Sequence, residues 1–239
     1  MVGLSKSYNG KAAVKDLSLS VPAGEVFAFL GPNGAGKTTT IKMLVGLLRP
    51  SAGTIRICGL DLATDSQEAR GKLAYVPDQP YLYEKLSGRE FLHFVGGMFG
   101  IPRGEVEERI ERLTQVFDLG SFLDHLSESY SHGMKQRLVF ASALLHDPSV
   151  MVLDEPMVGL DPHSARVVLD LFRREAARGT TIFMSTHSLP VAEKTADRIG
   201  ILKDGELVAL GSMAELKART GQEGDLEEIF LALTGEDAG

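Results

Sequence analysis

The chain has 239 residues, of which 44% are hydrophobic and 24% are charged, as in an ordinary folded globular protein. Its net charge of −7 argues against a broad electrostatic surface for nucleic acid. The single cysteine excludes an intramolecular disulfide and a cysteine-rich metal site. No apolar run reaches the ~20 residues that span a bilayer, and no charged and then apolar leader opens the sequence, so we expect no secretory signal.

The first predicted elements are strands. Short apolar patches between residues 4 and 21 predict edge strands before the turn Pro22-Ala23-Gly24. The apolar run 25–30 predicts a buried strand. After residue 40, the apolar residues Ile41, Leu44, Val45 and Leu48 recur at helical spacing, which predicts a helix. A strand and a helix therefore flank residues 31–39.

Residues 31–39 read G-x-x-x-x-G-K-T, a loop that holds the phosphates of a nucleotide. Backbone N–H groups at a helix start attract anions, and glycines let a phosphate approach closely. Lys37 adds a cation for the β and γ phosphates, and the hydroxyl of Thr38 suits an accompanying Mg²⁺. The predicted nucleotide-binding residues of the loop are Gly31, Pro32, Asn33, Gly34, Ala35, Gly36, Lys37, Thr38 and Thr39.

A further strand pair is expected over 53–62, with Cys58 as a packed strand residue, and another strand over 71–76 that Pro77 stops. Residues 84–147 then read as a mostly helical insert. Ser87 and Glu90 have the spacing of a capping box. Further on, an amphipathic helix is predicted from the apolar positions Val106, Ile110, Leu113 and Phe117.

Strand patterns return after the insert. The run 150–153 ends at Asp154-Glu155, and the run 180–184 ends near His187, with a helix between them that Asp161-Pro162 starts. Strands that alternate with helices predict a mainly parallel sheet covered on both faces. A hairpin is expected around Asp204-Gly205, and a last amphipathic helix over 226–233 is expected to pack against the core or, as the alternative, to dock a partner.

Two carboxylates follow the strand that ends at 153. Parallel strands deliver their C-terminal ends to one edge of the sheet, where ligands bind. Because the phosphate loop follows another such strand, Asp154 is a candidate Mg²⁺ ligand and Glu155 a candidate base for the water that attacks the γ phosphate.

The order of these motifs resembles the nucleotide-binding subunit of an ATP-binding cassette (ABC) transporter over nearly the whole chain. The resemblance implies an α/β fold of the P-loop NTPase (RecA-like) class, in which a mainly parallel sheet carries an antiparallel β subdomain and an inserted helical subdomain. It divides a single domain, 1–239, into a nucleotide-binding core of 1–83 and 148–239 and a helical part of 84–147.

The resemblance also implies roles for residues outside the loop. Tyr8 lies where the family stacks an aromatic ring on adenine, and His187 where it places a histidine that contacts the γ phosphate. Residues 130–137 occupy the place of the family signature, Leu-Ser-Gly-Gly-Gln, in which Ser131 and Gly133 match. Ser131 also suits a helix N-cap, and residues 159–161 resemble the family's dimer-contacting loop.

Three signature positions and one metal position depart from the family pattern. Tyr130, His132 and Met134 replace Leu, Gly and Gln. Asp78 holds the place of a glutamine that contacts the metal and the membrane partner; a carboxylate can still bind Mg²⁺. Only seven residues precede Tyr8, so the start of the chain is either trimmed or short.

In the family, two subunits enclose two ATP molecules. The resemblance therefore implies ATP and Mg²⁺ as cofactors, a homodimer or a heterodimer with another ABC subunit, and ATP hydrolysis that energises an integral membrane permease. The protein is then expected to be cytoplasmic and peripheral on the inner face of the cell membrane, with no nucleic-acid partner. The tail 225–230 and the signature are similar to those of export-type members. Two alternatives are a soluble ABC ATPase that acts on ribosomes or DNA, and a small-molecule kinase.

Overall fold

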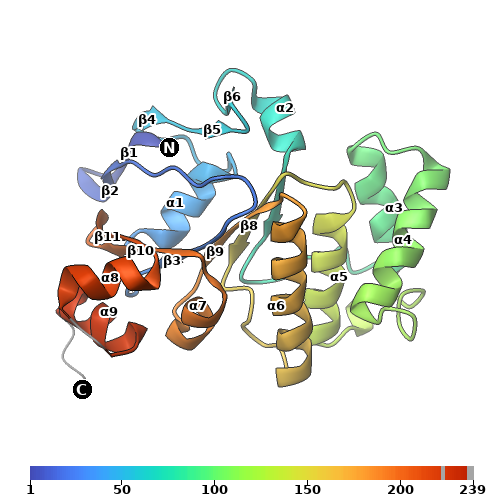
Figure 1. Ribbon diagram of the computed structural model, residues 1–239. Helices are drawn as coiled ribbons and strands as arrows, with labels where there is room; N and C mark the ends of the chain where they lie inside the picture. The colour runs from blue at the N-terminus through green and yellow to red at the C-terminus, as the bar shows by residue number, and fades with distance from the viewer. Residues whose placement is uncertain (222–223, 236–239) are drawn as a thin grey trace.

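A six-stranded sheet forms the centre of the computed structural model, which describes residues 1–221 and 224–235 (Figure 1). The strand order is β11-β10-β3-β9-β8-β7, and every pair is parallel except the β10–β11 hairpin. The mainly parallel sheet predicted from sequence is confirmed. Its strands are β3 (Val26–Leu30), β7 (Leu73–Val76), β8 (Val150–Asp154), β9 (Thr181–Ser185), β10 (Arg198–Lys203) and β11 (Glu206–Gly211).

Side chains of the central strands alternate between two hydrophobic clusters, one on each face. Val26, Ala28 and Leu30 of β3 belong to one cluster, whereas Phe27 and Phe29 belong to the other. Since successive side chains of a strand point to opposite faces, the continuous apolar run of β3 is explained by burial on both sides.

Helices cover both faces of this sheet. Figure 1 shows α1 (Lys37–Leu44) on the side of the antiparallel strands, and α7 (Leu189–Thr195), α8 (Met213–Thr220) and α9 (Leu226–Thr234) on the other. The long α6 (Pro162–Ala177) begins where Asp161 accepts hydrogen bonds from the backbone N and Oγ of Ser164. This matches the predicted helix start. On α9, Leu226, Ile229 and Phe230 join the sheet's hydrophobic cluster, so the prediction that this helix packs against the core is confirmed.

The N-terminal strands form a separate antiparallel sheet of order β2-β1-β4. It consists of β1 (Val2–Tyr8), β2 (Lys11–Leu17) and β4 (Ala52–Thr54), and the short hairpin β5 (Arg56–Ile57) and β6 (Leu60–Asp61) follows it, before α2 (Ser66–Gly71). The expectation for Cys58 was wrong: it is exposed in the turn of this hairpin, with φ 51. Together with Gly59 at φ 84 it makes the two positive-φ positions of a tight hairpin turn, which hydropathy alone does not reveal.

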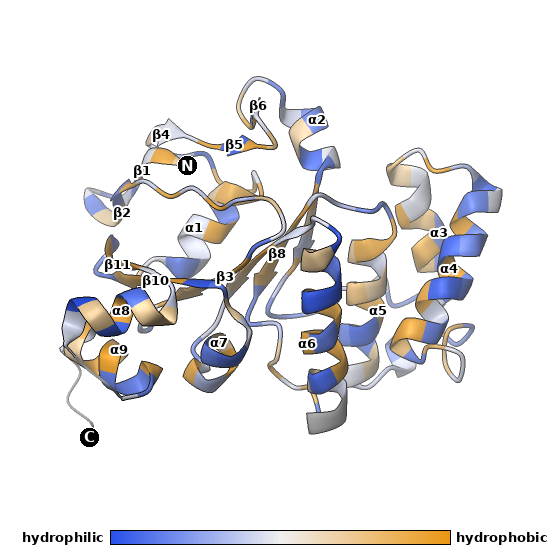
Figure 2. Ribbon diagram, viewed as in Figure 1, coloured by the Kyte–Doolittle hydropathy of each residue, from blue (hydrophilic) through white to orange (hydrophobic). Residues whose placement is uncertain are grey.

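The segment 84–147 contains α3 (Gly88–Met98), α4 (Arg103–Phe117), a 3₁₀ turn over Ser127–Ser129 and α5 (His132–Leu144). The capping box of Ser87 and Glu90 is present. The four predicted apolar positions of α4 are buried, and Figure 2 shows polar residues along its outer side. One hydrophobic cluster joins these helices to the sheet, so the division at 84 and 147 remains a proposal about domains.

Among the residues that the structure describes, no helix combines the length and apolarity needed to cross a membrane.

Candidate functional site

The phosphate loop connects β3 to α1, and its glycines are required by close backbone approaches. A Cβ at Gly36 would lie 2.4 Å from the carbonyl oxygen of Ala13, and a Cβ at Gly31 would lie 2.3 Å from that of Leu202. Gly36, with φ 107, is also the N-cap of α1. The backbone of the loop is therefore held against β2 and β10, and the N–H groups at the start of α1 have a fixed direction.

Lys37, the first residue of α1, turns back over the loop. Its Nζ donates to the carbonyl oxygen of Gly31 and, at 3.1 Å, to that of Pro32. Burial lowers the pKa of Lys37, while the charges of Glu155 and Asp154 act in the opposite direction. The ammonium group thus lies in the loop, within the electrostatic field of both carboxylates.

Four neighbouring strands, β3, β9, β8 and β7, each end in a predicted site segment. They deliver, in that order, the phosphate loop, His187, the pair Asp154-Glu155 and Asp78. Because the strands are parallel, all four segments leave from the same edge of the sheet. The structure therefore places these residues together, as the sequence predicts; their functional roles remain proposals.

Asp154 is the most deeply buried carboxylate of this group, at 4% exposure. It accepts a 2.5 Å hydrogen bond from the hydroxyl of Ser185 on β9. Burial raises the pKa of Asp154, with further increases from Asp78 and Glu155, while Ser185 and Lys37 act to lower it. The same surroundings raise the pKa of Tyr75 to about 12, first through burial and then through Asp154 and Asp78. Folding therefore concentrates negative charge where a cation would bind.

Glu155 and His187 contact each other, which sequence reasoning did not foresee. The Nδ1 of His187 lies 2.9 Å from Oε2 of Glu155, and the backbone N of His187 donates to the same oxygen at 3.3 Å. The β8–β9 register pairs Asp154 with Ser185, so residues just beyond the two strands come side by side. Glu155 has φ 48, a left-handed conformation uncommon for a residue with a side chain.

A cavity of about 470 Å³ lies beside the phosphate loop, and three of its residues, Thr186, Leu189 and Phe230, were absent from the predicted site. Thr186 is buried and follows β9, and Phe230 comes from α9, far along the chain. The helical spacing of the apolar residues predicts that Phe230 lies on the buried face of its helix. It does not reveal that α9 reaches the phosphate loop. The lining residues are Gly31, Pro32, Asn33, Thr186, His187, Leu189 and Phe230.

Tyr8, Ser131 and Gly133 do not come from the four strand ends: Tyr8 ends β1, and Ser131 and Gly133 lie at the start of α5. Tyr8 is 45% exposed at the end of β1, and the ammonium of Lys6 lies 5.5 Å from its ring centroid. Ser131 is exposed and is the N-cap of α5, where its Oγ accepts from the backbone N of Met134 at 3.3 Å. Within the described residues, no hydrogen bond joins Ser131 to the phosphate loop.

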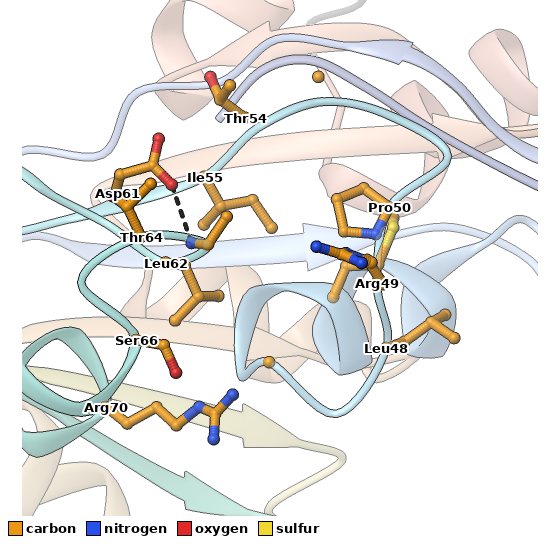
Figure 3. A pocket seen from close by; sticks show the side chains of 14 residues that line it. Leu48, Arg49, Pro50, Thr54, Ile55, Asp61, Leu62, Thr64, Ser66 and Arg70 are labelled. Atoms are coloured by element: carbon orange, nitrogen blue, oxygen red, sulfur yellow. Dashed lines mark hydrogen bonds between the residues drawn. The ribbon is translucent and has the colours of Figure 1, made fainter.

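A second cavity, of about 480 Å³, shares no residue with the phosphate site (Figure 3). It lies between the end of α1, the β4–β6 region and α2. Figure 3 shows Leu48, Ile55 and Leu62 among its apolar lining and Arg49 and Arg70 among its polar lining. The two cavities have nearly the same volume, so volume does not distinguish the candidate functional site. The residues at the strand ends mark that site.

Asp154→Asn should raise the Tm of the free chain at pH 8 while abolishing its use of Mg-ATP. Since folding raises the pKa of Asp154, the ionised form is disfavoured in the folded state, and this loss of stability grows as the pH rises. Thermal unfolding without Mg²⁺ or nucleotide measures the difference in Tm between the variant and the wild type. This difference should shrink as the pH falls toward the range in which an ordinary aspartate titrates. The exposed Asp170→Asn is the control. A lower Tm for Asp154→Asn at pH 8 would contradict the expectation.

Comparison with known proteins finds a matching family model and similar ATP-binding proteins. A family model described as ABC transporter matches residues 14–158. The daunorubicin/doxorubicin resistance ATP-binding protein DrrA of Streptomyces peucetius is 41% identical over 92% of this chain, which spans 66% of that relative's length. A solved ATP-binding subunit of an ABC transporter is similar at TM-score 0.92 and 35% identity, over 97% of both chains. A dimeric post-hydrolysis ATP-binding cassette bound to ADP and Pi has TM-score 0.81 and 25% identity, over 89% of this chain and 97% of that one.

Proposed function

This chain belongs to the ABC transporter family as one of its ATPase domains, and from that premise we propose that two copies, or one copy and a related subunit, hydrolyse Mg-ATP to drive a separate membrane permease. The proposal rests above all on the convergence of the phosphate loop, Asp154, Glu155 and His187 at one sheet edge. Export is the proposed direction, in keeping with the drug-resistance name of DrrA.

The oxygen-rich group at this edge fits Mg²⁺. Thr38 offers a hydroxyl and Asp154 a buried carboxylate, with Asp78 as a third candidate. When bound, the ion supplies charge neutralisation on the β and γ phosphates. The loop N–H groups and Lys37 bind and orient those phosphates, so the chain's own part is to hold the γ phosphate in one position.

Glu155 is proposed to accept the proton of the attacking water. His187 donates its Nδ1 hydrogen to the Glu155 carboxylate and so restricts where that carboxylate points. The other ring nitrogen of His187, Nε2, is then the atom left to contact the γ phosphate.

Ser131 and Gly133 are proposed to complete the site of the opposing subunit. They lie at the N-terminus of α5, a 13-residue helix whose end attracts anions, and the Ser131 hydroxyl is exposed. The dimeric relative bound to ADP and Pi is the structural precedent for such pairing. A sample that neither binds Mg-ATP nor pairs in its presence, by size-exclusion chromatography with light scattering, would overturn the proposal.

Tyr8→Ala should weaken ATP binding by about 1 kcal/mol, or roughly fivefold, through lost stacking on adenine. The ring is exposed on β1, and the adjacent strand β2 contacts the phosphate loop at Gly36. Equilibrium binding of ATP measures the loss, and Tyr81→Ala, which removes another exposed tyrosine, is the control. An unchanged affinity would mean that Tyr8 does not contact the base.

The permease is proposed to dock on an aromatic surface formed by Tyr81, Tyr83, Phe94 and Met98. Tyr81 is 75% and Met98 71% exposed, although both are large and apolar. Ring centroids lie 5.9 Å apart for Tyr81 and Tyr83 and 5.4 Å apart for Tyr83 and Phe94. Exposed apolar groups gathered in this way mark interaction sites. Tyr81 and Tyr83 follow Asp78 by three and five residues, so docking at this end of the surface would be mechanically linked to the metal site.

The double variant Tyr83→Ser, Phe94→Ser should lose at least tenfold in recovery of the permease while the purified chain keeps its own ATPase activity. The measurement is co-purification from detergent-solubilised membranes, with the integral membrane protein identified by its sequence. Leu47→Ser, which changes an exposed leucine elsewhere, is the control. Recovery with ribosomes instead would favour the soluble alternative, and full recovery of the permease by the double variant would reject this docking surface.

A further inference from the structure

The residue after Ser131 lies against the segment that follows Glu155. Nε2 of His132 is 3.3 Å from the carbonyl oxygen of Val158, which can only accept, so the ring donates. The backbone N of Val158 in turn donates to the carbonyl oxygen of Glu155 at 3.1 Å. Two hydrogen bonds therefore connect the backbone of Glu155 to the residue beside Ser131.

Packing at Gly159 makes this contact tight. A Cβ there would lie 2.3 Å from Cδ2 and 2.4 Å from Nε2 of His132, so the backbone of this residue touches the imidazole ring. Gly159 also has φ +76, which favours glycine. A side chain at this position would need both a backbone conformation that favours glycine and a displacement of the His132 ring.

We propose that His132 couples the two ATP sites of the dimer, an inference that rests on the proposed function. Glu155 serves the nucleotide on its own chain's loop, and Ser131 serves the nucleotide on the partner's loop. When the segment after Glu155 moves, Val158 and Gly159 move with it, and both contact His132. His132 in turn moves Ser131, its neighbour in the chain. The family signature has glycine at this position, which has no side chain to make the contact. In this chain His132 supplies a donor that glycine lacks.

The test uses the Glu155→Gln chain, in which bound ATP is expected to persist, and follows ATP binding and dimer formation. The parent should bind ATP with a Hill coefficient above 1. His132→Ala should lower the coefficient toward the value that dimer formation alone gives, and should reduce the affinity of the second ATP about fivefold or more. His132→Gln, which keeps an N–H donor, should retain most of the coupling.

The proposed function and the coupling through His132 fail in different ways in this test. A parent that does not pair with Mg-ATP overturns the proposed function and the inference with it. A parent that pairs, alongside a His132→Ala variant of equal cooperativity, overturns the inference alone.

A double-mutant cycle then tests the contact itself. Gly159→Ala should lower the Hill coefficient of the parent as His132→Ala does, because the new methyl group displaces the His132 ring or the segment. In a His132→Gly background, the same change should have little further effect. Gly100→Ala is the matched control, since Gly100 has a similar φ of +69 with no atom near its Cβ position. Strictly additive effects of the His132 and Gly159 changes would overturn the proposal.

Discussion

Glu155→Gln should retain Mg-ATP binding and lower turnover about 10²–10⁴-fold, the range that a positioned general base contributes. Glutamine has nearly the same shape and keeps an oxygen that accepts the hydrogen bonds from Nδ1 and the backbone N of His187. It has no useful basicity, so the attacking water keeps its proton. Binding and chemistry should therefore separate at this one position.

Equilibrium ATP binding and phosphate release, measured on the same sample, test this prediction. Glu193→Gln removes an exposed carboxylate on α7 and is the charge-matched control. Unchanged phosphate release would remove Glu155 from the role of base. Lost ATP binding would assign it to binding rather than to proton transfer.

Complementation should show that Ser131 acts on the partner's nucleotide. A mixed dimer of Ser131→Arg with Lys37→Ala retains one site in which Lys37 of one chain faces the serine of the other, so about half the hydrolysis of the wild-type dimer should return. Each variant alone should be inactive, because every site then lacks either the lysine or the serine.

The reverse arrangement is the control. In a dimer of wild type with a chain that carries both substitutions, each site contains one substituted residue if Ser131 acts across the interface. This dimer should therefore be inactive. If Ser131 acted within its own chain, the two results would be exchanged: the mixed dimer would be dead and the doubly substituted one half-active. Tagging the two chains differently isolates each mixed dimer for phosphate-release assays.

The sequence was most informative where a local rule decides the structure. The capping box of Ser87 and Glu90 needs only residues three apart, and the apolar stripe of α4 needs only helical spacing. The phosphate loop belongs to the same class, because its strand, glycines and lysine are contiguous. Its placement at the end of β3 followed directly from that order.

Cys58 marks the limit of such rules. The apolar character around it favours a strand, yet a tight turn with two positive φ values places it in solvent. The pairing of β5 with β6 decided this, since a two-residue connection forces the left-handed conformation. Propensity at a single position does not carry that information.

By itself, the sequence determined the central strands, the longer helices and the residues that bring charge to the strand ends, since each depends on neighbours along the chain. The short helices α2, α7 and α8 did not follow from it. Tertiary structure alone decided which of those residues meet. The parallel register of β8 and β9 brought His187 onto Glu155, and the packing of α9 brought Phe230 to the phosphate loop. It also placed His132 against Gly159. Contacts between residues far apart in sequence depend on how whole elements pack, which no local pattern encodes.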